Sequence, residues 1–101
     1  MGIDEELKDQ DEQIAAVQAA DAKYKTDKNI DEYIEFWEKV WSEGGLKFNG
    51  IKWTFMLADL YIKAKRYEDA LSFVKKIQAE KPNYSDKANQ YIEKIEKKLN
   101  K

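Results

Sequence analysis

The sequence contains neither cysteine nor histidine, and it has a single proline and only four glycines. Without cysteine the chain can form no disulfide and offers no thiolate nucleophile. Without histidine it lacks the side chain most often used for proton transfer near neutral pH, and the usual zinc ligands are missing as well. We therefore expect that the protein is not an enzyme and has no catalytic, cofactor-binding or metal-binding residues.

Long hydrophobic runs are also missing. No apolar stretch approaches the roughly 20 residues that a membrane span requires. The first residues, Met1 to Glu6, lack the basic and apolar regions of a secretion signal. We therefore expect no membrane association, and we predict a cytoplasmic location, with which the lack of cysteine is compatible.

The residues that are present favour one small helical domain with an uneven distribution of charge. Of the 101 residues, 43% are hydrophobic and 38% are charged. Residues 1–50 hold 13 acidic and six basic residues, a net charge of −7, whereas residues 51–101 hold seven acidic and 12 basic residues, a net charge of +5. The acidic first half argues against nucleic-acid binding by the whole chain. The simpler interpretation is that each half has a solvated helix surface.

Apolar residues recur at helical spacing in five segments. The predicted helices cover residues 3–26, 30–43, 51–64, 67–80 and 85–101. Residues 4–12 are nearly all polar and acidic, and we interpret residues 1–12 as an acidic end that frays or forms a tail. Gly44 and Gly45 are expected to end the second helix, because glycine readily adopts the left-handed conformation.

Residues 46–53 support two interpretations. Asn49-Gly50 lies between alternating apolar residues, which is a hairpin signal. Alternatively, Asn49 caps a helix that begins at Gly50 or Ile51. We favour the helix, because an isolated short hairpin is only marginally stable.

The chain also shows internal similarity. Residues 66–77 align with residues 29–40 at an offset of 37, with Phe73 over Phe36, and one residue of slack places Asp21 over Asp59. Residues 51–84 resemble a tetratricopeptide repeat (TPR), whose pattern of small, aromatic and proline positions spans 34 residues. The residues that carry the resemblance are Leu57-Ala58, Tyr61, Ala70 and Pro82.

This resemblance implies an all-α fold, a short right-handed α-solenoid of two antiparallel helix pairs and a C-terminal capping helix. Residues 13–47 would form a degenerate repeat, residues 51–84 a full repeat and residues 85–101 the cap, all within a single domain. The family binds extended peptides or partner helices, so we expect an adaptor or regulator that binds another protein. The groove residues that the resemblance implies are Lys52, Phe55, Asp59, Ile62 and Lys63.

The sequence leaves alternatives for both the binding surface and the function. Phe55 and Ile62 either contact a partner or are buried under the N-terminal or the final helix; in the second case the binding surface is expected first around Trp41 and Phe48. Two other functions also remain. The charge asymmetry fits a self-assembling homo-oligomer, and seven lysines fit a nucleic-acid-associated accessory protein: Lys75, Lys76, Lys81, Lys87, Lys94, Lys97 and Lys98.

Overall fold

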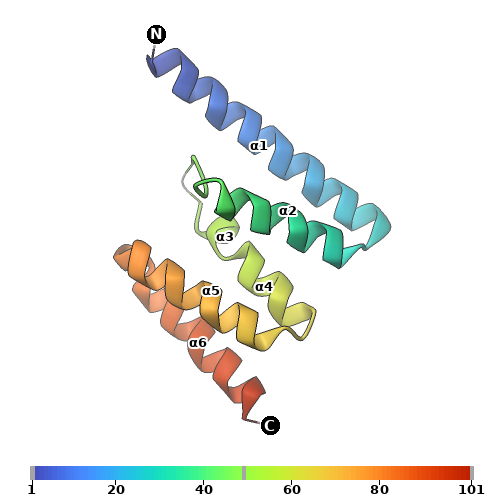
Figure 1. Ribbon diagram of the computed structural model, residues 1–101, viewed down its shortest axis with the longest axis vertical. Helices are drawn as coiled ribbons and strands as arrows, with labels where there is room; N and C mark the ends of the chain where they lie inside the picture. Colours follow the sequence, from blue (N-terminus) through green and yellow to red (C-terminus); the bar gives the residue numbers. More distant parts are fainter. Residues whose placement is uncertain (1, 49, 101) are drawn as a thin grey trace. The chain divides into compact units, whose positions relative to one another are not determined.

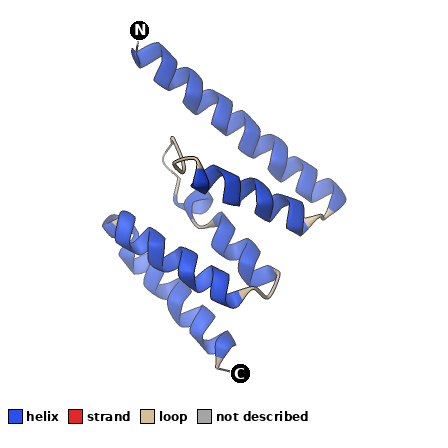
Figure 2. Ribbon diagram, viewed as in Figure 1, coloured by secondary structure: helices blue, strands red, loops and turns tan. Residues whose placement is uncertain are grey.

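The computed structural model describes residues 2–48 and 50–100, and every regular element within these ranges is a helix (Figures 1 and 2). The prediction of an all-α fold is confirmed. The chain divides into two compact units, residues 1–50 (unit 1) and residues 51–101 (unit 2). The division falls between the two predicted helix pairs.

The described residues of unit 1 form two helices, α1 (Gly2–Asp27) and α2 (Ile30–Ser42), that pack against each other (Figure 1). Residues 2–12, which the sequence predicts to fray, form the start of α1. The core residues of unit 1 follow the helical spacing of the sequence, because apolar side chains three or four positions apart share one face of a helix. The buried side chains are Val17, Tyr33, Ile34 and Trp37.

The ends of α2 follow from local chemistry. Asn29 caps its start, where the side-chain oxygen accepts a hydrogen bond from the backbone N–H of Glu32 at 3.1 Å. Gly44 and Gly45 follow its end with φ angles of 113° and 83°, and the backbone N–H of Gly45 donates to the carbonyl of Val40. The predicted glycine termination of this helix is confirmed.

Unit 2 begins with two helices, α3 (Ile51–Thr54) and α4 (Met56–Lys63), where the sequence predicts a single one over residues 51–64. The irregularity is local. Phe55 donates its backbone N–H to the carbonyl of Ile51, and its own carbonyl accepts from the N–H of Asp59. Helical hydrogen bonding therefore continues across the break, and the described part of residues 46–53 contains no strand. The predicted cap at Asn49 lies outside the described residues.

The remaining elements of unit 2 are α5 (Tyr67–Glu80), the short 3-10 helix η1 (Pro82–Tyr84) and α6 (Ser85–Leu99). Helix α5 packs against both α4 and α6. Ala58, Ala70 and Ala88 have no exposed surface, so each of the three longer helices of this unit buries a small residue. Within the described residues, no helix is both long enough and apolar enough to cross a membrane.

Candidate partner-binding surfaces

The predicted groove residues of unit 2 do not share one environment. Phe55 is only 1% exposed. Its ring stacks on that of Tyr91 of α6, with centroids 4.9 Å apart and planes at 8°, and it also contacts Tyr84 at 6.2 Å. Of the two interpretations left open for Phe55, the structure therefore shows burial under the final helix.

Asp59 takes part in the same contact with α6. The hydroxyl of Tyr91 donates a hydrogen bond to Asp59 Oδ1 at 2.8 Å. Burial raises the pKa of Tyr91 above its usual range, and the hydrogen bond to Asp59 raises it further. The stack on Phe55 and this hydrogen bond together hold α6 against α4.

The other predicted groove residues, like the exposed Asp59, are more accessible to solvent than Phe55. Ile62 is half-buried, and Lys52 and Lys63 are exposed. The ammonium group of Lys52 lies 4.7 Å from the centre of the Trp53 ring, a cation–π contact within its own helix. Lys52, Lys63 and part of Ile62 are therefore accessible. Phe55, the aromatic side chain that was expected to contact a partner there, is buried.

Trp41 and Phe48, the second predicted location, belong to unit 1 and are both half-buried. The ring of Trp41 lies against Gly45: a Cβ atom at Gly45 would come within 2.8 Å of Cζ3 and 2.9 Å of Cε3. Gly45 also has a φ of 83°. Both the close approach and the backbone conformation therefore require glycine at this position.

Helix α1 fixes the loop that follows these glycines. The side-chain amide of Gln13 donates to the Gly45 carbonyl at 3.0 Å, and its oxygen accepts from the backbone N–H of Lys47 at 2.7 Å. Gln10 donates to the Lys47 carbonyl at 2.6 Å. Sequence reasoning missed this pair of glutamines. The available signal was their spacing of three residues on one helix face, since an amide side chain can both donate and accept.

A hollow of about 270 Å³ opens between α1, α2 and this loop. Its apolar lining comes from Ala16, Phe36 and Val40. Charged and polar groups surround them, and the full lining adds Gln13, Lys39, Glu43, Gly45 and Lys47. The hollow therefore combines an apolar surface with charges of both signs, which is the usual character of a protein-interaction site.

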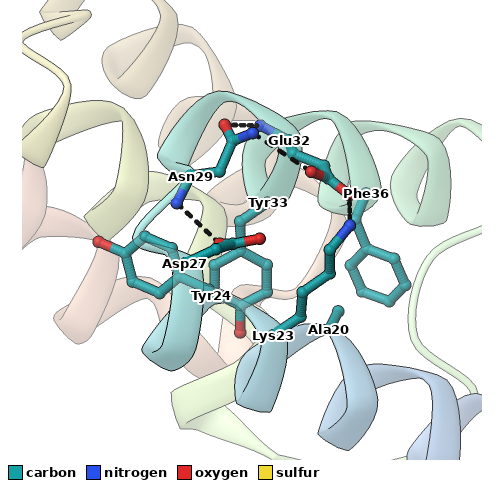
Figure 3. Close-up of a pocket in the computed structure, with 8 residues that line it drawn as sticks. All are labelled: Ala20, Lys23, Tyr24, Asp27, Asn29, Glu32, Tyr33 and Phe36. Carbon is teal, nitrogen blue, oxygen red and sulfur yellow. Dashed lines mark hydrogen bonds and ion pairs between the residues drawn. The ribbon is translucent and has the colours of Figure 1, made fainter.

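A second hollow in unit 1, of about 110 Å³, lies at the turn between α1 and α2, and Figure 3 shows the eight residues around it. Lys23 of α1 forms an ion pair with Glu32 of α2. Glu32 also accepts a hydrogen bond from the side-chain amide of Asn29. The rings of Tyr24 and Tyr33 stack with centroids 5.0 Å apart. These contacts close the turn, so we assign this corner a role in joining the two helices.

Tyr33, which lines this hollow, also connects α2 to α1 through a hydrogen bond. Its hydroxyl donates to Asp21 Oδ1 at 3.0 Å. Burial raises the pKa of Tyr33 to about 12, and the hydrogen bond to Asp21 contributes to the increase. The hydroxyl therefore remains protonated over the neutral range and ties α2 to α1.

An open depression of about 600 Å³ lies along α6 in unit 2. Three lysines and one glutamate supply its charges, and its lining is Gln90, Glu93, Lys94, Lys97, Lys98 and Asn100. The C-terminal part of the predicted lysine set thus gathers on one helix. Lys75 and Lys76 lie on α5, and Lys81 and Lys87 lie outside this depression.

Comparisons of the chain with protein-family models, with curated proteins and with solved structures each return no match.

Proposed function

We propose that this chain is a protein-interaction module with a TPR-like architecture, a short right-handed solenoid of two helix pairs and a capping helix. Burial within unit 2 supports this architecture. Ala58 and Ala70 are fully buried where the repeat pattern places small residues, and Leu57 and Tyr61 are buried beside them. Pro82 begins η1 after one intervening residue beyond the end of α5, in keeping with its expected role at the end of a repeat. A cytoplasmic location and a non-catalytic role remain predictions.

The proposed binding site is the hollow of unit 1 between α1, α2 and the glycine loop. This choice rests on two features of the hollow, its apolar lining and the loop at its edge that Gln13 holds in place. Ala16, Phe36 and Val40 offer apolar surface, while Gln13 holds the loop backbone in place through two hydrogen bonds. A site that is already ordered loses less conformational entropy when a partner binds.

The size and charge of the hollow indicate what it accepts. Its volume is near the lower limit of about 300 Å³ for small-molecule pockets, so one or two side chains fill it better than a large cofactor does. Lys39 and Lys47 at its edge outnumber Glu43. We therefore expect a peptide or helix that inserts one bulky apolar side chain and carries an acidic residue beside it.

A single substitution in α1 tests this site. Ala16 is exposed and lines the hollow, so Ala16→Glu places a charge at the apolar surface without opening the core. Ala22→Glu is the matched control, because it makes the same change on the same helix at an exposed position outside the hollow. Both variants should keep the circular dichroism spectrum of the wild type, since glutamate is a good helix former.

The measurement is quantitative mass spectrometry of proteins captured from a lysate by the immobilised full chain. We expect a set of partners that the wild type and Ala22→Glu retain equally and that Ala16→Glu loses. Capture of the same proteins in the same amounts by all three chains would show that the hollow is not the binding site. Partners lost equally with both substitutions would attribute the effect to net charge instead.

A further inference from the structure

The charge division of the sequence coincides with the structural division of the chain. The net charge of −7 belongs to residues 1–50 and that of +5 to residues 51–101. These ranges are also the two compact units. Each copy of the chain therefore presents one acidic and one basic folded surface, and any two copies carry complementary units.

The acidic surface has a defined pair of carboxylates on α2. Asp31 and Glu35 are exposed and four residues apart, so they lie on the same side of the helix. Among the described residues neither side chain forms an ion pair. Their neighbour Glu32, by contrast, is bound to Lys23. Asp31 and Glu35 thus remain available for a cation from outside the unit.

The basic surface has a matching pair on α6. Lys94 and Lys98 are exposed, lie four residues apart and line the open depression along this helix together with Lys97. Neither lysine forms an ion pair within the part of the chain that the structure describes. At a rise of about 1.5 Å per residue, each of the two pairs extends about 6 Å along its helix.

We propose that the Asp31/Glu35 face of α2 in one copy binds the Lys94/Lys98 face of α6 in a second copy of this chain. The two faces differ, so the contact is heterologous and leaves one free α2 face and one free α6 face in each pair of copies. A third copy can add by the same contact. Exposed charges carry the contact, so salt weakens it.

The first test is sedimentation of the full-length wild-type chain over a concentration series. At an ionic strength of about 0.1 M, the average mass should rise above the monomer value of 11.9 kDa as the concentration increases. At about 1 M, where screening is strong, it should return to the monomer value. A monomer at every concentration and salt would overturn the proposal, as would a salt-dependent compaction with no change of mass.

Charge reversal identifies the faces. Asp31→Lys/Glu35→Lys should be monomeric by itself, and Lys94→Glu/Lys98→Glu should be monomeric by itself, because each presents like charges at the contact. An equimolar mixture should recover the wild-type mass, because each reversed face now has an oppositely charged partner. The matched control is Lys75→Glu/Lys76→Glu, the same charge change on exposed residues of α5, which should associate like the wild type.

Each remaining outcome has one meaning. If the two reversed variants stay monomeric when mixed, the contact does not join these faces and the proposal fails. If the wild type stays monomeric but shifts a nucleic-acid probe in a gel at low salt, the lysines of α6 bind a polyanion instead. The Ala16→Glu variant should associate like the wild type, which separates this contact from the hollow of unit 1.

Discussion

In each unit an aspartate accepts a hydrogen bond from a tyrosine hydroxyl, but the two hydrogen bonds connect different helices. In unit 1, Asp21 of α1 accepts a hydrogen bond from Tyr33 of the next helix. In unit 2, Asp59 of α4 accepts one from Tyr91 of α6, two helices further along the chain. The internal alignment of the sequence places Asp21 over Asp59, so this similarity extends to the chemistry of the two positions.

The difference shows the effect of the additional long helix, α6, in unit 2. In unit 2, α6 supplies both the tyrosine for Asp59 and the stacked ring over Phe55. Unit 1 has two helices, and the hollow between α1 and α2 lies beside its glycine loop. The additional helix therefore covers Phe55 in unit 2, whereas unit 1 keeps the apolar depression that we propose as the binding site.

The largest expected effect comes from the core of unit 1. Trp37 has no exposed surface, and it contacts the ring of Phe36 edge to face at a centroid distance of 5.5 Å. Trp37→Ala should lower the stability of unit 1 by about 3–5 kcal/mol. Hydrogen exchange resolved by peptide should show faster exchange in α1 and α2 than in α4 to α6. An equal loss of protection in both units would show that they unfold as one cooperative body.

The second effect is in unit 2. Ala70 is fully buried on α5, so Ala70→Leu forces extra methyl groups into a filled space. Such overpacking typically costs about 1–3 kcal/mol. The urea midpoint should fall accordingly. Ala79→Leu, on the exposed side of the same helix, is the control and should leave the midpoint unchanged; an equal fall for both would point to helix propensity rather than packing.

These two residues also show what the sequence could predict. The spacing of three and four residues places Trp37 on the apolar face of its helix, where it is buried, and it located the boundaries of α2 and α5 to within one residue, because local periodicity determines which face of a helix is apolar. The small residues Ala58 and Ala70, which belong to the repeat-like pattern, are fully buried. These features depend on neighbours in sequence or on a single helix pair.

The binding surface was harder to predict, because it depends on contacts between distant residues. The pattern left open whether Phe55 and Ile62 were covered, and the cover of Phe55 is Tyr91, 36 residues further along the chain. The Gln13 contacts span 32 and 34 residues. Gln13 and its two partners, Gly45 and Lys47, all line the hollow. The spacing of Gln10 and Gln13 on one face of α1 is a local signal, but it does not identify the backbone groups that they contact.

The third effect tests the tyrosine–aspartate comparison directly. Tyr33→Phe and Tyr91→Phe each remove one hydroxyl and keep the ring in place. Each should lower stability by about 1 kcal/mol, the usual net contribution of such a hydrogen bond. Amide exchange should increase at α2 for Tyr33→Phe and at α6 for Tyr91→Phe. If Tyr91→Phe leaves the protection of α6 unchanged, the stack on Phe55 alone holds that helix.

The raised pKa of Tyr33 predicts a related dependence on pH. An exposed tyrosine in the unfolded chain titrates near pH 10, whereas burial raises the pKa of Tyr33 to about 12. The folded state therefore favours the protonated hydroxyl. This contribution is complete below about pH 10 and is lost as the pH rises toward 12. The stability of the wild type should fall more steeply across this window than that of Tyr33→Phe; parallel curves would show that Tyr33 titrates normally.

The smallest effect concerns the turns that end the first helix of each unit's pair. Lys28 and Lys65 both have positive φ angles, 60° and 63°, which a lysine adopts at a cost of about 1–2 kcal/mol. Glycine removes that cost but loses about 0.5–1 kcal/mol through greater freedom of the unfolded chain. Lys28→Gly and Lys65→Gly should therefore each stabilise the protein by roughly 0.5–1 kcal/mol. Because the two φ angles are nearly equal, the gains should be similar, although Asn29 caps the following helix in unit 1 and Arg66 forms no side-chain cap in unit 2.

Lys76→Gly, within α5, is the control and should lower the stability by about 1 kcal/mol. Urea unfolding measures all three, and a loss of stability at Lys65→Gly would mean that the lysine side chain contributes more to this turn than its backbone conformation costs.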